Sequence, residues 1–327
     1  NIKTHKIDLL NPDKEKVSNF TKRIKFLFHL ASELNDESKM MKINYYGTKV
    51  LVDSIKNKNI PFIYFSSIGV FDFSKSNQIN ENSHKKQFNL YEKTKFLSEE
   101  YILKSYQKNN LKFIILRPSI ILDLNMKSKI IDYLITLSRI GIKINFSKKI
   151  IANFILLDDV VKIILQIFEK EKAFCQSFNI SSNILLKDFL MTINKILDKK
   201  TFISLPFNLF INIIGLSLFF KPKNKKIKKF FTNTCNVSCQ KIEGLLAGKI
   251  QLDYFNFLYD SYCFRAVLTN DSGMKLLSFF VHVSEMTERM GGIGDGGLII
   301  RCGVTFASKI RYLDPRTEII LMTGLDY

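Results

Sequence analysis

Three residues have the types and spacing for proton transfer to or from a hydroxyl group: Ser67, Tyr91 and Lys95. Tyr91 and Lys95 stand four apart in a segment that opens a helix-period stretch, so they project from one helical face. A tyrosine with an ordinary pKa of about 10 is a poor base at neutral pH, and a cation held beside it favours the phenolate. We therefore expect Tyr91 to act as a general acid/base beside Lys95, with Ser67 orienting the substrate hydroxyl.

The surrounding pattern predicts a parallel α/β sheet that positions these residues. Apolar, strand-like runs at 24–30, 61–67 and 112–118 alternate with helix-period segments near 39–57 and 90–108. This is the rhythm of strand-helix-strand units. The second run ends at Ser67, and the third is followed by Ser119. Because ligands of such sheets bind beyond the carboxyl ends of the strands, we expect the site there.

Short motifs along the chain resemble the extended short-chain dehydrogenase/reductase family, in its nucleotide-sugar epimerase/dehydratase group. The resemblance covers roughly residues 5 to 235. The motifs follow the order of the family: Asp8-Leu9, His29-Leu30-Ala31, Asn44-Tyr-Tyr-Gly47-Thr48, Ser66-Ser67-Ile-Gly-Val70, Tyr91-x-x-x-Lys95, Leu116-Arg117-Pro118, Phe154-Ile-Leu-Leu-Asp158-Asp159-Val160 and Phe178-Asn179-Ile180.

The resemblance implies a Rossmann-like sheet that binds NAD or NADP, with a smaller C-terminal substrate lobe. The residues that would contact the cofactor are Asp8 and Leu9 at the adenine, Leu30, Ala31 and Ser32 at the ribose and pyrophosphate, and Pro118, Ser119, Tyr91 and Lys95 at the nicotinamide and its ribose.

The reaction that the resemblance implies begins with hydride transfer from a sugar carbon to NAD(P)+ while Tyr91 removes the hydroxyl proton. Epimerases, dehydratases and reductases of the family share this step. The sequence around the lobe favours an epimerase or reductase that acts on a nucleotide sugar in surface-polysaccharide synthesis. We also expect that the chain can form a homodimer.

The chain departs from the family pattern at its start. Dinucleotide-binding folds place a glycine-rich turn after their first strand, and here Gly47 is the first glycine. We therefore expect an N-terminally incomplete Rossmann-like sheet that begins near its third strand, in a fragment or in a chain whose cofactor binding is lost. Two rival functions follow: a noncatalytic relic that serves as an interaction protein, or a protein anchored to a membrane through residues 202–220.

Charge and glycine content divide the chain at about residue 235. The net charge is +19, yet residues 236–327 hold nine lysines and arginines against ten acidic residues. We therefore predict a family-like unit over 1–235 and an unassigned segment over 236–327. The lysines of the first unit are scattered and no nucleic-acid motif accompanies them, so we expect no nucleic-acid partner.

An apolar run at 202–220 precedes six lysines between 221 and 229. Its length would span a bilayer, but Pro206, Gly215 and three other small or polar residues interrupt it. We expect a helix of the substrate lobe, with membrane contact as the alternative. The five cysteines lack metal-ligand spacing, so we expect no metal and a cytoplasmic protein with reduced thiols.

Overall fold

The computed structural model describes residues 7–22, 24–123, 129–139, 141–168, 170–197, 203–220, 230–248 and 250. Its main sheet has four parallel strands in the order β1-β2-β4-β8. They are β1 (Leu27–His29), β2 (Phe62–Phe65), β4 (Phe113–Pro118) and β8 (Gln176–Ile180). Every residue of β2 and β4 is buried, as expected for inner strands covered on both faces. The expected parallel α/β fold is confirmed, and the first expected strand is shorter than the run 24–30.

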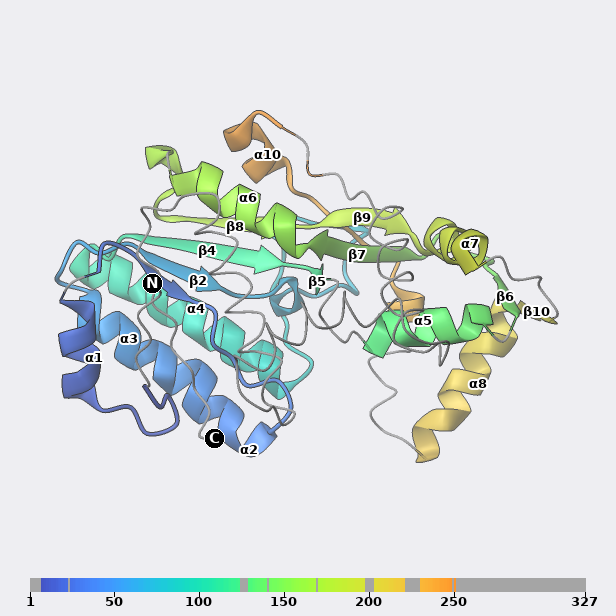
Figure 1. Ribbon diagram of the computed structural model, residues 1–327, viewed down its shortest axis with the longest axis horizontal. Coiled ribbons are helices and arrows are strands. Elements are labelled where there is room, and N and C mark those ends of the chain that lie inside the picture. Colours follow the sequence, from blue (N-terminus) through green and yellow to red (C-terminus); the bar gives the residue numbers. More distant parts are fainter. Residues whose placement is uncertain are drawn as a thin grey trace, which may run out of the picture.

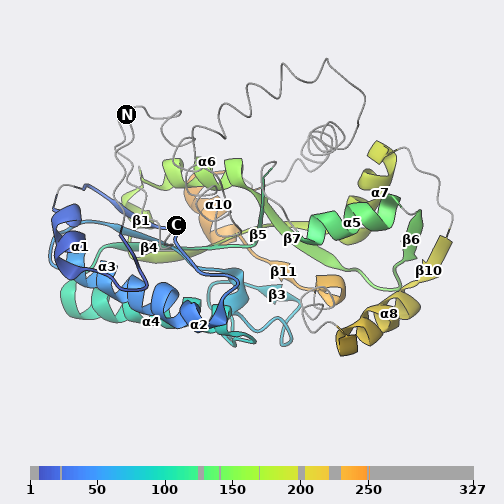
Figure 2. The same cartoon turned by 60° about the horizontal axis from the view of Figure 1, so that its bottom comes forward.

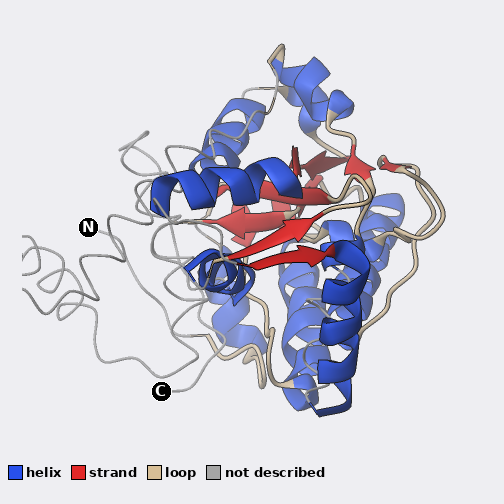
Figure 3. Cartoon of the chain, turned by 90° about the vertical axis from the view of Figure 1, so that its right-hand side faces the viewer, coloured by secondary structure: helices blue, strands red, loops and turns tan. Residues whose placement is uncertain are grey.

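Helices cover both faces of this sheet (Figures 1 and 3). One face carries α1 (Lys14–Thr21), α3 (Thr48–Ile55) and α4 (Leu90–Asn109), and the other carries α6 (Leu157–Phe168) and α10 (Gln240–Leu246). Side chains of β2 alternate between the two cores: Tyr64 packs with Leu51 and Ile102 on the α3 and α4 face. Ile63 packs with Ile164 on the α6 face. This alternation follows from the period of two along a strand.

The helical stretch after β1 has three parts. Helix α2 (Glu37–Met40) continues into a π-helix, η1 (Met41–Gly47), which leads into α3. Gly47 has an ordinary helical φ, so the reason for glycine is space: an added Cβ would lie 3.1 Å from the Cβ of Leu9. Leu9 is fully buried at this contact.

Between β2 and α4 the chain makes an excursion over residues 71–88. It begins after a 3₁₀ turn, η2 (Ile68–Val70), and contains β3 (Gln78–Ile79). An isolated bridge joins Phe71 to Lys85 near its two ends. Strand β3 pairs with β11 (Asn236–Val237), and Figure 2 shows this pair between the main sheet's helices and the lobe.

The lobe lies at the right of Figure 1 and has its own apolar core. Its three-stranded sheet, in the order β5-β7-β9, is mixed because β5 and β7 are parallel and β7 and β9 antiparallel. A second pair joins β6 to β10. The elements of the lobe are β5 (Ile120–Leu122), α5 (Lys129–Arg139), β6 (Ile142–Asn145), β7 (Ile151–Leu156), β9 (Ser182–Leu185), α7 (Leu186–Leu197), β10 (Ile203–Pro206) and α8 (Phe207–Phe220). The short 3₁₀ turn η3 (Glu171–Ala173) belongs to the main unit, between α6 and β8.

Two features bear on the predicted division of the chain. The apolar run forms α8, and within the described ranges no helix is long and apolar enough to cross a membrane. Residues Val237, Cys239 and Ile242, beyond the predicted division at 235, pack into the core on the α6 face. Residues 251–327, most of the unassigned segment, lie outside the described residues.

The contact between Gly47 and Leu9 makes a prediction for stability. Gly47→Ala should lower the free energy of unfolding by about 1 to 2 kcal/mol, because the added methyl group overpacks a filled contact. Gly244→Ala, in α10 with open space around it, is the matched control and should raise the free energy of unfolding by about 0.5 to 1 kcal/mol. Urea titration of both variants measures the difference. A gain of stability in Gly47→Ala would show that the contact leaves room.

Candidate active site

The carboxyl ends of the main strands lie at one edge of the sheet, and in Figure 1 the arrowheads of β2 and β4 point toward the lobe. Ser32 follows β1, Ser67 follows β2 and Ser119 follows β4. The backbone N–H of Ser119 donates to the carbonyl of Ile180 at 3.0 Å, which extends the pairing of β4 with β8 past its last residue. The structure therefore brings these three serines to the expected edge.

Helix α4 begins so that Tyr91 stands in its first turn. The side chain of Asn89 caps the helix by accepting from the N–H of Glu92 at 2.9 Å. Glu92 in turn accepts from the N–H of Phe88 at 2.7 Å, so carboxylate and amide satisfy backbone donors on both sides of the cap. The helix macrodipole is positive at this end, which favours negative charge in the first turn.

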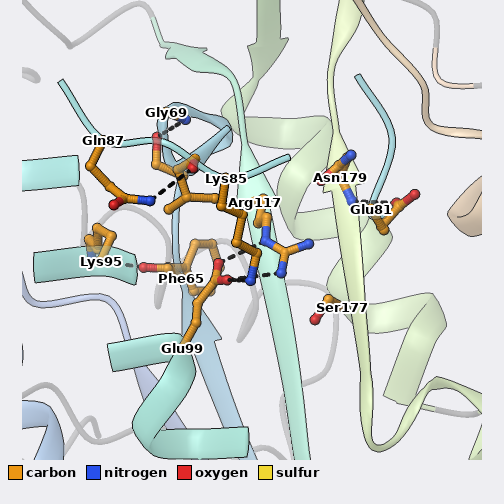
Figure 4. A network of polar contacts seen from close by, with 12 residues as sticks. Phe65, Gly69, Glu81, Lys85, Gln87, Lys95, Glu99, Arg117, Ser177 and Asn179 are labelled. Carbon is orange, nitrogen blue, oxygen red and sulfur yellow. Dashed lines mark hydrogen bonds and ion pairs between the residues drawn. The ribbon is translucent and has the colours of Figure 1, made fainter. Parts of the chain in front are cut away.

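Lys95 ties this helix to the end of β2. Its side chain is 2% exposed, and Nζ donates to the carbonyl of Phe65 at 2.8 Å (Figure 4). The same Nζ lies 4.9 Å from the ring centre of Tyr64 and 5.8 Å from that of Tyr91. Tyr91 and Lys95 are thus close together, as expected. The carbonyl that Lys95 contacts belongs to Phe65, which directly precedes Ser66 and Ser67 in the chain.

Two opposing effects act on the pKa of Lys95. Burial lowers its pKa to about 7, and the carboxylate of Glu99, one helical turn further on, acts against this shift. An ordinary lysine is fully protonated at neutral pH, whereas burial weakens the hold of Lys95 on its proton.

The phenol of Tyr91 differs from the expectation of a favoured phenolate. Part of the side chain remains exposed, but its surroundings are dense enough that burial raises its pKa to about 12. The hydroxyl of Ser32 opposes this shift, and the negative charge of Glu92 adds to it. Burial is therefore the largest influence on the pKa of Tyr91, and Tyr91 keeps its proton at neutral pH. In this state it is a proton donor.

Ser67 caps the turn η2: its Oγ accepts from the N–H of Gly69 at 3.1 Å. A hydroxyl that accepts one hydrogen bond still carries its own hydrogen for donation. Ser67 can therefore hold the turn and orient a second group, although the structure shows no contact that joins it to Tyr91.

Three buried hydroxyls at the strand ends have no hydrogen-bond partner within the described residues: Ser32 Oγ, Ser66 Oγ and Ser119 Oγ. Of these hydroxyls, that of Ser32 acts on the phenol of Tyr91 and lowers its pKa. Unpaired buried polar atoms are costly, so their presence at the strand ends is typical of a site that receives a polar ligand.

The other expected cofactor residues have mainly structural contacts. Asp8 accepts from the N–H of Leu10 at 2.7 Å, and Leu9 packs against the helix that Gly47 leads into. Leu30 is partly buried against the core on the α6 face, and Ala31 is partly buried against the core on the α3 and α4 face. Within the described part of the chain, no contact joins Asp8 or Leu9 to Tyr91 or Lys95.

Sequence reasoning did not select Glu99, which forms buried ion pairs with Arg117 and Lys85 behind the site (Figure 4). A signal was present: Glu99 follows Lys95 by four residues and continues the helical face that Tyr91 begins. Among the residues that the structure describes, no group of three or more histidine, cysteine, aspartate or glutamate side chains is placed to hold a metal ion.

The fold is a Rossmann-like parallel α/β fold, and comparison with solved structures agrees. UDP-glucuronic acid 4-epimerase from Bacillus cereus, in complex with NAD, matches with a TM-score of 0.62 and 18% identity over 80% of each chain. RMD from Pseudomonas aeruginosa, complexed with NADPH, matches with a TM-score of 0.59 and 15% identity, over 79% of this chain and 87% of that chain. UDP-glucose 4-epimerase from Thermotoga maritima has a TM-score of 0.58 and 17% identity, over 80% and 84%.

A similarity to a known family is found by sequence as well. The sequence model of an NAD-binding family, described as male sterility protein, matches residues 7–164. This range includes Ser67, Tyr91, Lys95 and the first three strands of the main sheet. The chain thus resembles this NAD-binding family over residues 7–164, and it shares the fold of the solved nucleotide-sugar epimerases.

The buried cation makes a prediction for stability against pH. Between pH 7 and 10 the unfolded chain holds the Lys95 proton and the folded chain has lost it, so this group makes folding more favourable as the pH rises. Lys95→Met removes that contribution. The free energy of unfolding, measured in urea, should therefore rise more from pH 7 to 10 for the native chain than for Lys95→Met. Lys104→Met, at an exposed position of α4, is the control and should stay parallel to the native chain. A constant difference for Lys95→Met would contradict the lowered pKa.

Proposed function

We propose that the chain is an NAD(P)-dependent epimerase or reductase of nucleotide sugars that works through Tyr91 and Lys95. The observation that carries this proposal is the bond from Lys95 to the Phe65 carbonyl. It fixes the phenol and the ammonium of α4 at the carboxyl end of β2, where sheets of this kind bind their ligands. The match to an NAD-binding family and the fold of NAD-bound and NADPH-bound relatives support the same conclusion.

The residues at the strand ends suit a dinucleotide cofactor. Ser32 and Ser119 offer unpaired buried hydroxyls on either side of β2, where ribose and carboxamide groups would find partners. In this proposal Lys95 donates to the hydroxyls of the nicotinamide ribose, while Leu30, Ala31 and Pro118 supply apolar surface. Bound NAD(P)+ would accept a hydride from the sugar carbon, and NAD(P)H would return one.

Tyr91 handles the proton of the reacting hydroxyl. In the oxidative direction the hydroxyl proton passes to the Tyr91 phenolate as the C–H bond breaks, leaving a ketone; in the reductive direction the phenol gives the proton to the ketone oxygen. Burial holds Tyr91 protonated, so the resting site is prepared for reduction. The positive charge of Lys95 and of the helix N-terminus lowers the cost of the phenolate for oxidation. Ser67 donates its own hydrogen to the sugar oxygen and holds it in line.

The substrate class rests on the relatives and on charge. Solved relatives hold UDP-glucuronic acid and UDP-glucose, and a net charge of +19 suits a substrate that carries a diphosphate. We propose that the product serves surface-polysaccharide synthesis in the cytoplasm, by a chain that can form a homodimer. Membrane contact through 202–220 remains a separate proposal, tested by sedimentation of the full chain with vesicles.

The role of Tyr91 makes a direct prediction. With NAD+ and a panel of UDP-hexoses, Tyr91→Phe should lower kcat by at least about 100-fold, the usual contribution of a general acid/base. Tyr106→Phe, at an exposed position of the same helix, is the matched control and should keep native kcat. Circular dichroism shows whether both variants stay folded. A folded Tyr91→Phe with native kcat would refute the proposed mechanism.

A further inference from the structure

Behind the site, one buried carboxylate holds two cations (Figure 4). Glu99 is fully buried, and its Oε1 accepts from Nε of Arg117 at 2.7 Å. Its Oε2 accepts from Nη2 of Arg117 at 2.9 Å and from Nζ of Lys85 at 3.0 Å. Arg117 is itself 2% exposed, so this is a two-pronged ion pair inside the protein.

The same carboxylate belongs to the helical face of the site. Tyr91, Lys95 and Glu99 follow one another at intervals of four along α4, so a phenol, an ammonium and a carboxylate stand on successive turns. Lys95 lies between its two neighbours, and the charge of Glu99 raises its pKa against the effect of burial. Interactions between buried charges are screened only weakly, so Glu99 acts on Lys95 over one turn.

The groups that face Lys95 come from three elements. From α4 they are Tyr91 and Glu99, and from β2 they are the Tyr64 ring and the carbonyl of Phe65. From β1 comes His29, which burial keeps neutral because its pKa falls to about 3. Within the described ranges, Glu99 is the acidic group that acts on Lys95.

We propose that Glu99 is a positioning residue that keeps Lys95 charged beside Tyr91. Arg117 and Lys85 partly neutralise the carboxylate of Glu99, and so they determine how strongly it stabilises the charge of Lys95. For its catalytic meaning this inference rests on the proposed function. Its electrostatic part does not rest on that function, because it concerns the ion pairs of Glu99 with Arg117 and Lys85 and their effect on Lys95 one helical turn away.

The arrangement links the site to the 71–88 excursion. Lys85 stands near the end of this excursion and is bridged to Phe71, whose ring lies 5.1 Å from the guanidinium carbon of Arg117. The excursion also reaches the strand pair β3 and β11. A shift of the excursion that moves Lys85 away from Glu99 would leave more negative charge to act on Lys95, and would raise its pKa.

The proposal predicts shifts of opposite sign at Lys95. Glu99→Gln removes the anion and leaves Arg117 and Lys85 nearby, so the pKa of Lys95 should fall by about 1 unit or more, as for a charge pair at close range. Lys85→Gln removes a cation from Glu99 and should raise the pKa of Lys95. A role confined to packing would not give shifts of opposite sign.

The measurement is an NMR titration of the full chain with 13Cε-labelled lysine, in which Lys95→Met assigns the Lys95 signal. It needs neither cofactor nor substrate, so a chain without the proposed activity still tests it. A fall in Glu99→Gln with a rise in Lys85→Gln supports the proposal. An unchanged Lys95 pKa in Lys85→Gln, or shifts of one sign in both variants, overturns it.

Glu99→Gln leaves a buried guanidinium with a weakened partner, and this variant could fail to fold. Lys85 is about one-fifth exposed, so Lys85→Gln keeps the proposal open to refutation by itself. Where the enzyme is active, the pH above which kcat declines should move down in Glu99→Gln and up in Lys85→Gln, by the shifts that NMR records. A kcat profile that stays in place while the Lys95 pKa moves would overturn the catalytic part alone.

Discussion

The arrangement of the site depends on one buried ammonium group, that of Lys95. It joins the first turns of α4 to the end of β2 by donating to the Phe65 carbonyl, and it lies against the rings of Tyr64 and Tyr91. A buried charge is costly unless partners surround it, and here a carbonyl, two aromatic faces and the carboxylate of Glu99 share that role. We expect any change that removes one of them to alter the charge of Lys95.

The same constraint explains why polar residues gather in the middle of an apolar fold. Glu99 compensates Lys95 on one side and is itself held by Arg117 and Lys85 on the other. Arg117 is the fifth residue of β4, an otherwise apolar strand, so the network anchors α4 to two neighbouring strands. The position of the helix on the sheet is thus fixed by charge as well as by the apolar contacts of Ile102 with Tyr64.

Much of the fold could be predicted from the sequence because inner parallel strands are continuous apolar runs, as at 61–67 and 112–118. The neighbourhood of Tyr91 and Lys95 followed from helical spacing alone. Two things could not be predicted. The raised pKa of Tyr91 depends on burial, which spacing does not reveal. The pair of Glu99 with Arg117 joins residues that are eighteen apart and on different elements, so only the tertiary structure brings them together. The roles of the cofactor residues remain predictions.

The proposed function requires that the strand ends bind a dinucleotide beside Lys95. Calorimetric titration of the full chain with NAD+ and with NADH measures this directly. We predict saturable binding of one cofactor per chain, weakened in Lys95→Met and unchanged when the exposed Lys104 is replaced in the same way. A folded chain that binds neither form of NAD(H) nor of NADP(H), or that binds them equally well without Lys95, would contradict the account.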